Sequence, residues 1–177
     1  MPDDLLQRLR QGDRLALSRL LTLIQRGENI GGLRAALSRK RDTRVVAITG
    51  SAGVGKSTLI GRMIDWLRDK GQRVAVLACD PQSPLTGGAL LGDRIRMPSR
   101  PDDAGLFIRS LTAAGGREAV AEHLDLMLAT LNEFGFDVVF IETAGAGQTD
   151  TAVRALCDVV VLLVQPEAGD DLQWQKA

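Results

Sequence analysis

Apolar residues recur at helical spacing through the first quarter of the chain. From Leu5 to Ile24 leucine and isoleucine return about every three or four residues among arginines and glutamines, and Gly12-Asp13 interrupts the repeat. Such spacing places one apolar stripe along a helix, whereas glycine is a poor helix residue. We therefore expect two short helices here, within an N-terminal helical segment formed by residues 1–43.

After residue 43, short apolar runs alternate with helical stretches. The runs are rich in β-branched residues and bounded by turn residues, as in strands that are buried on both faces. Strands are expected at 45–48, 74–79, 106–109, 137–141 and 159–164, and helices at 56–70, 117–134 and within 142–156. Alternating strands and helices predict an α/β fold, with a mainly parallel sheet covered by helices on both faces. We assign this domain to residues 44–177.

One stretch of this domain, residues 81–105, has no periodicity. It contains proline, glycine, serine and arginine, and is much longer than the usual connection within a compact domain. Connections of that length commonly carry function.

Composition narrows the classes of partner. Lysine plus arginine and aspartate plus glutamate number 22 each, so no excess charge indicates a nucleic-acid groove or an anionic membrane surface. The longest apolar run has six residues, whereas a bilayer span needs about 20. The two cysteines, Cys79 and Cys157, lack metal-binding spacing and suggest a reducing compartment. We therefore expect a cytoplasmic protein that binds neither nucleic acid nor membrane.

The strongest chemical signal is a G-x-x-x-x-G-K-[ST] motif that directly follows the first expected strand and precedes a helix. It consists of Gly50, Ser51, Ala52, Gly53, Val54, Gly55, Lys56 and Ser57, and Thr58 comes next. Glycines let the chain turn tightly and direct backbone N–H groups towards phosphates. Lys56 adds a charge for the β- and γ-phosphates, Ser57 offers a hydroxyl to Mg²⁺, and Thr58 would contact the α-phosphate. The alternative is a glycine-rich turn that binds nothing.

A nucleoside triphosphate with Mg²⁺ also needs an acidic residue at the end of a neighbouring strand. Asp80 and Glu142 each end an expected strand, and Asp93 lies in the long connection. Gly145, three residues after Glu142, could sense the γ-phosphate through its N–H group, and Gln148 could position the attacking water. The alternative for either strand-end acid is a solvated carboxylate that caps the next element. Arg94 and Arg109 are candidates to approach the phosphates.

Several motifs in order resemble the MeaB/ArgK family of P-loop GTPases, a group that also carries the name LAO/AO transport system ATPase. They lie at residues 50–58, 80–97, 107–110, 142–150 and 166–173. The resemblance implies GTP/GDP and Mg²⁺ as ligands, with Asp80, Asp93 and Glu142 around the metal. Residues 142–150 would form switch II, and residues 169–176 a further switch. It also implies a chaperone that gates cofactor loading or repair of a cobalamin-dependent acyl-CoA mutase.

The chain departs from the family pattern at several points. Trp174-Gln175-Lys176 replaces Gly-Ile-Lys, and Asp150 stands where glutamate is common. The chain stops before the Asn-Lys-x-Asp segment that reads guanine and before the family's dimerisation extension, so the domain is expected to be incomplete at its C-terminus. A homodimer is therefore left open.

Three functions fit these features. The leading one is a GTPase that is slow without a partner, because the sequence offers no evident arginine finger or general base. The others are an ATP-dependent kinase or ATPase of the ArgK type, and a truncated, non-catalytic nucleotide-binding module.

Overall fold

The computed structural model describes residues 2–37, 42–51, 53–80, 103–112, 123–143 and 153–165. Three helices come first: α1 (Pro2–Arg10), α2 (Arg14–Gln25) and α3 (Ile30–Ala36). The break between α1 and α2 falls at the predicted place. Asp13 caps α2, because its Oδ1 accepts hydrogen bonds from the N–H groups of Leu15 at 2.8 Å and Ala16 at 3.2 Å.

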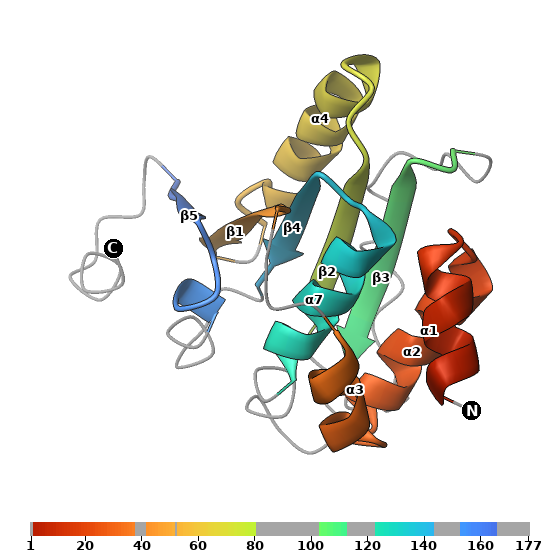
Figure 1. Ribbon diagram of the computed structural model, residues 1–177. Helices are drawn as coiled ribbons and strands as arrows, with labels where there is room; N and C mark the ends of the chain where they lie inside the picture. Colours follow the sequence, from red (N-terminus) through yellow and green to blue (C-terminus); the bar gives the residue numbers. More distant parts are fainter. Residues whose placement is uncertain are drawn as a thin grey trace.

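Five parallel strands form one sheet in the order β3-β2-β4-β1-β5 (Figure 1). They are β1 (Arg44–Gly50), β2 (Val74–Asp80), β3 (Leu106–Thr112), β4 (Val138–Glu142) and β5 (Val159–Leu163). Helix α4 (Lys56–Asp69) follows β1, and α7 (Leu124–Phe134) precedes β4. The predicted α/β fold with a parallel sheet is confirmed. Most of the helix expected within 142–156, and the first part of the one expected at 117–134, lie outside the described residues.

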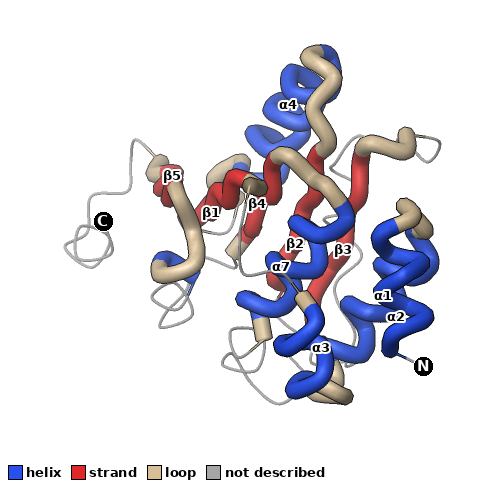
Figure 2. Tube along the Cα trace, in the orientation of Figure 1, coloured by secondary structure: helices blue, strands red, loops and turns tan. Residues whose placement is uncertain are grey.

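Successive residues of β1 face opposite sides of the sheet, and each side has its own core. Val46 and Ile48 pack with Ile60 and Ile64 of α4. Val45 and Ala47 belong to a larger cluster that contains α7 and the N-terminal helices. Figure 2 shows the strands between these two helical layers. The predicted covering of both faces is therefore present, because alternate side chains of a buried strand need an apolar partner on each side.

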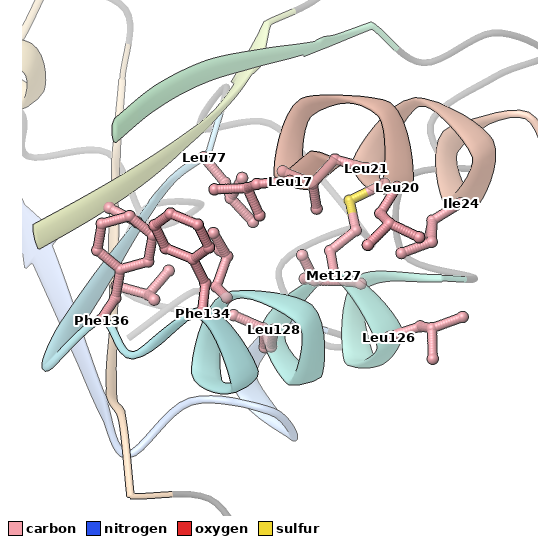
Figure 3. Packing of buried hydrophobic residues seen from close by; sticks show 14 of the residues in the cluster. Leu17, Leu20, Leu21, Ile24, Leu77, Leu126, Met127, Leu128, Phe134 and Phe136 are labelled. Atoms are coloured by element: carbon pink, nitrogen blue, oxygen red, sulfur yellow. The ribbon is translucent and has the colours of Figure 1, made fainter. Parts of the chain in front are cut away.

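The N-terminal helices share the core of the sheet. In Figure 3, Leu17, Leu20 and Ile24 of α2 lie beside Met127 and other apolar residues of α7. Polar contacts fix the outside of this layer. Arg10 of α1 forms an ion pair with Glu133 of α7 at 2.6 Å, and Arg34 of α3 forms one with Asp125 of α7.

Among the residues that the structure describes, none of the helices is both long and apolar enough to cross a bilayer.

Candidate functional site

The turn from β1 into α4 adopts backbone conformations that favour glycine. Gly50, Gly53 and Gly55 have φ angles of 145°, 80° and 99°. A Cβ on Gly50 would lie 2.4 Å from the carbonyl oxygen of Leu163, so a side chain is also excluded by space. Gly55 is the N-cap of α4 and supplies no capping side chain. The positive end of the α4 dipole lies at this turn, and it favours an anion there.

Lys56 begins α4, and its side chain folds back over this turn. Its Nζ donates hydrogen bonds to the carbonyl oxygens of Gly50 and Ser51, both at 3.0 Å. The side chain is buried, with the residue only 8% exposed. Its positive charge is therefore held inside the loop, beside the N-terminus of α4.

Ser57 and Glu142 meet at this end of the sheet although 85 residues separate them in the sequence. Ser57 Oγ donates a hydrogen bond to Glu142 Oε1 at 2.8 Å, and both residues are buried. Strand pairing explains the meeting. Ile48, near the end of β1, is paired with Glu142 of β4, and Ser57 lies in the first turn of α4, the helix that follows β1. The carboxylate therefore lies at the base of the helix that carries the serine.

This pair of oxygens suits a magnesium ion. Mg²⁺ prefers six oxygen ligands at about 2.0–2.1 Å, so adjacent ligands lie about 2.9 Å apart. The 2.8 Å between Ser57 Oγ and Glu142 Oε1 matches that spacing. A hydroxyl and a carboxylate could hold the ion together, or the carboxylate could hold one of its water ligands. Among the described residues, no group of three or more His, Cys, Asp or Glu side chains is placed to bind a metal.

The other predicted site residues are placed less completely. Asp80 ends β2, two residues beyond Ala78, which is paired with Glu142, so its backbone reaches the same edge of the sheet. The side chain of Asp80 is not among those described. Thr58 lies in α4 and is exposed. Four predicted site residues, Ala52, Asp93, Gly145 and Gln148, lie outside the described residues, as does Arg94.

Arg109 does not approach this site, and that prediction is wrong. Its guanidinium donates hydrogen bonds to Ser18 O at 3.1 Å, Thr22 Oγ1 at 2.9 Å and Gln25 Oε1 at 3.1 Å. On β3 its side chain shares the face of Phe107 and Leu111, which belong to the core under α2. Arg109 thus joins α2 to the sheet.

Chain topology explains why these groups meet at this edge. From β1 the chain continues through α4 to β2, on the far side of β4, while from β4 it continues to β5, on the far side of β1. Connections that leave two neighbouring strands in opposite directions open a crevice at their carboxyl ends, where α/β proteins bind ligands. Gly50, Lys56, Ser57 and Glu142 all lie at or just beyond the carboxyl ends of β1 and β4, the two strands at which the connections diverge.

One residue of this region, which lies within the expected switch II at 142–150, was given no role of its own. Thr143 directly follows Glu142 and is buried, with the residue only 3% exposed. Its N–H group donates to Ile48 O at 3.1 Å, which extends the pairing of β1 and β4 past the end of β4. The available signal was a hydroxyl residue next to a strand-end acid.

Comparison with known proteins gives one family. A model described as "Methylmalonyl Co-A mutase-associated GTPase MeaB" matches residues 17–177. The chain is 42% identical over 179 residues to a protein of Pyrococcus abyssi named as a GTPase, a match that covers 100% of this chain and 55% of the relative. It is 41% identical over 171 residues to the fused isobutyryl-CoA mutase of Nocardia farcinica, covering 93% of this chain and 16% of that protein.

A solved structure agrees with these matches. The crystal structure of a protein named LAO/AO transport system kinase is similar with a TM-score of 0.67 and 29% identity, covering 92% of this chain and 49% of that one. The chain spans about half the length of several curated relatives that it matches.

Proposed function

The chain belongs to the MeaB family of methylmalonyl-CoA mutase-associated GTPases, and from this premise we propose that it binds GTP with Mg²⁺ and hydrolyses it to GDP. The contact between Ser57 and Glu142 carries the proposal. It joins the metal-binding hydroxyl of the G-x-x-x-x-G-K-[ST] motif to an acid on the neighbouring strand. That pairing is what a triphosphate with Mg²⁺ requires of a P-loop.

Each described residue of the nucleotide site then has a chemical role. The turn from Gly50 to Gly55 and the first N–H groups of α4 bind the phosphates. The ammonium group of Lys56 exchanges the carbonyl oxygens of Gly50 and Ser51 for phosphate oxygens, which attract it more strongly because they are charged. Bound Mg²⁺ would neutralise charge on the β- and γ-phosphates, and Ser57 and Glu142 would hold it.

The remaining assignments complete the reaction. Water attacks the γ-phosphate in line with the departing GDP, and Gln148 positions that water. Asp80 and Asp93 would support the metal shell, and the N–H group of Gly145 would bond the γ-phosphate. Lys56 and the N-terminus of α4 stabilise the charge that develops in the transition state. Turnover is slow without a partner, because the sequence offers no evident arginine finger and Arg109 is committed to its contacts with α2.

The partner we propose is a cobalamin-dependent acyl-CoA mutase. The family description names a mutase-associated GTPase, and one relative is a fused isobutyryl-CoA mutase. A domain that occurs both joined to a mutase and apart from one suits a chaperone that gates cofactor loading or repair. We propose that it acts in the cytoplasm. We also propose that residues 1–43 form an N-terminal helical segment and that residues 44–177 form the P-loop NTPase domain.

A second candidate function is an ATP-dependent kinase. It is suggested by the name of the similar solved structure, a transport system kinase. Displacement of a fluorescent nucleotide by GTP and by ATP, each with Mg²⁺, distinguishes the two. The GTPase proposal expects GTP to displace the fluorescent nucleotide at a concentration no higher than ATP requires. A preference for ATP would reject it in favour of the kinase. Nucleotide binding with phosphate release no faster than in buffer would identify a non-catalytic binding module.

A further inference from the structure

Thr143 differs from the other buried threonines whose hydroxyl contacts are described. Thr43 Oγ1 donates to Phe136 O at 2.6 Å, and Thr130 Oγ1 donates to Leu126 O at 2.8 Å. Thr143 Oγ1 is buried too, but it has no hydrogen-bond partner among the described residues. A hydroxyl that loses water without gaining a partner is unfavourable, and valine would fill the same space without that cost.

The position of Thr143 connects this hydroxyl to the nucleotide site. Glu142, its neighbour, contacts Ser57 at the base of α4. Side chains alternate along an extended chain, so Thr143 faces the other side of the sheet from Glu142. The backbone N–H of Thr143 is bonded to Ile48 O, two residues before the phosphate turn begins at Gly50. Glu142 and Thr143 are therefore adjacent at the carboxyl end of β4, with the carboxylate bonded to Ser57 and the hydroxyl on the opposite face of the sheet.

We propose that Thr143 is a positioning residue of the nucleotide site, whose hydroxyl gains its hydrogen-bond partner when Mg²⁺ and GTP are bound. The partner is a backbone group or a water molecule brought to the carboxyl end of β4 in that state. The unfavourable burial of the hydroxyl then raises the energy of the nucleotide-free protein and is relieved on binding, which strengthens nucleotide affinity. This inference rests on the proposed function.

The test compares Thr143→Val with wild type in two states, nucleotide-free and saturated with Mg²⁺ and a non-hydrolysable GTP analogue. The melting temperature of the nucleotide-free variant is expected to equal or exceed that of wild type, because no hydrogen bond is lost. The nucleotide-induced rise in melting temperature is expected to be smaller, and the affinity for the analogue about 3- to 10-fold weaker, the loss expected for one hydrogen bond. Thr143→Ser keeps the hydroxyl and is expected to retain wild-type affinity.

Thr130→Val is the matched control, since its hydroxyl is buried and bonded within α7. It is expected to shift the melting temperature of both states equally and to leave affinity unchanged. A nucleotide-free Thr143→Val protein that melts below wild type, or one that binds the analogue as wild type does, overturns the inference. If wild type itself shows no rise in melting temperature with Mg²⁺ and the analogue, the proposed function fails instead.

Discussion

Replacing Glu142 with glutamine tests the metal site with little change of shape. Glutamine keeps an oxygen that can accept the hydrogen bond from Ser57, at present 2.8 Å long, but removes the negative charge. Since Glu142 is only 5% exposed, burial of its charge carries a desolvation cost in the nucleotide-free protein. The nucleotide-free variant is therefore expected to melt within a few degrees of wild type.

The effect on magnesium should be much larger. A carboxylate about 4 Å from a divalent cation is attracted by about 8 kcal/mol at an effective dielectric constant of about 20. Desolvation of both ions offsets much of this attraction. If about one third of the attraction remains after desolvation, removing the charge costs about 2.7 kcal/mol of Mg²⁺ binding free energy. That cost corresponds to an approximately 100-fold weaker affinity for Mg²⁺. We expect Glu142→Gln to need at least about 100-fold more Mg²⁺ for half-maximal GTP hydrolysis.

The assay is a Mg²⁺ titration of phosphate release, with thermal melting of each protein beside it. Glu133→Gln is the matched control, because it removes the same charge from an ion pair with Arg10 in the layer of α1 and α7. Such a partly exposed pair contributes about 0–1 kcal/mol to stability, so the control should lose little stability and keep its Mg²⁺ requirement. A Glu142→Gln protein whose Mg²⁺ requirement stays within about threefold of wild type would refute the assignment of Glu142 to the metal.

Three further predictions address other parts of the molecule. Lys56→Ala should lose nucleotide binding, because the charge held at Gly50 O and Ser51 O is removed, while circular dichroism shows the fold retained; calorimetry that finds wild-type affinity would contradict this. Arg109→Met breaks the contacts to α2, so it should lower the free energy of unfolding, measured in urea, by about 2–3 kcal/mol without changing nucleotide affinity. A loss of affinity at unchanged stability would instead place Arg109 at the phosphate site. The hydrogen bond from Arg8 and those from the start of α2 hold the pKa of Asp13 below its usual 3.8. The charge of Asp13 therefore stabilises the fold above that pH, and this stabilisation is lost as the pH falls through the lowered pKa. Asp13→Asn should melt below wild type at pH 7, by a difference that narrows towards pH 3; a difference independent of pH would contradict the role of the charge.

The sequence pattern predicted the strands well where a buried strand is a short run of apolar, β-branched residues. The β-branched run at 45–48 lies within β1, and the run at 74–79 became β2 with one more residue. β3 was predicted to end at Arg109, yet it continues to Thr112 because Ser110 to Thr112 pair with the end of β2. Ser110 and Thr112 are polar, so the sequence pattern did not predict this extension. The backbone groups of these residues can still pair with a neighbouring strand, whatever the side chain.

Strand order was not available from the sequence. Nothing in the composition of β4 indicates that it lies between β1 and β2, and that order brings Glu142 to Ser57. The residue type of the acid and its strand-end position were predictable, but its distance from the serine was not. Arg109 was misassigned for a related reason, because the face on which its side chain lies depends on the packing of α2.

We propose that Gly50 to Ser57 and Glu142 form a site that hydrolyses GTP with Mg²⁺. The decisive experiment follows phosphate release from GTP, with wild-type protein in excess over nucleotide and Lys56→Ala in parallel. We expect one phosphate per GTP from the wild type, dependent on Mg²⁺ and released faster than from the variant. Equal rates for the two proteins, or release that is unaffected by removing Mg²⁺, would contradict the proposal.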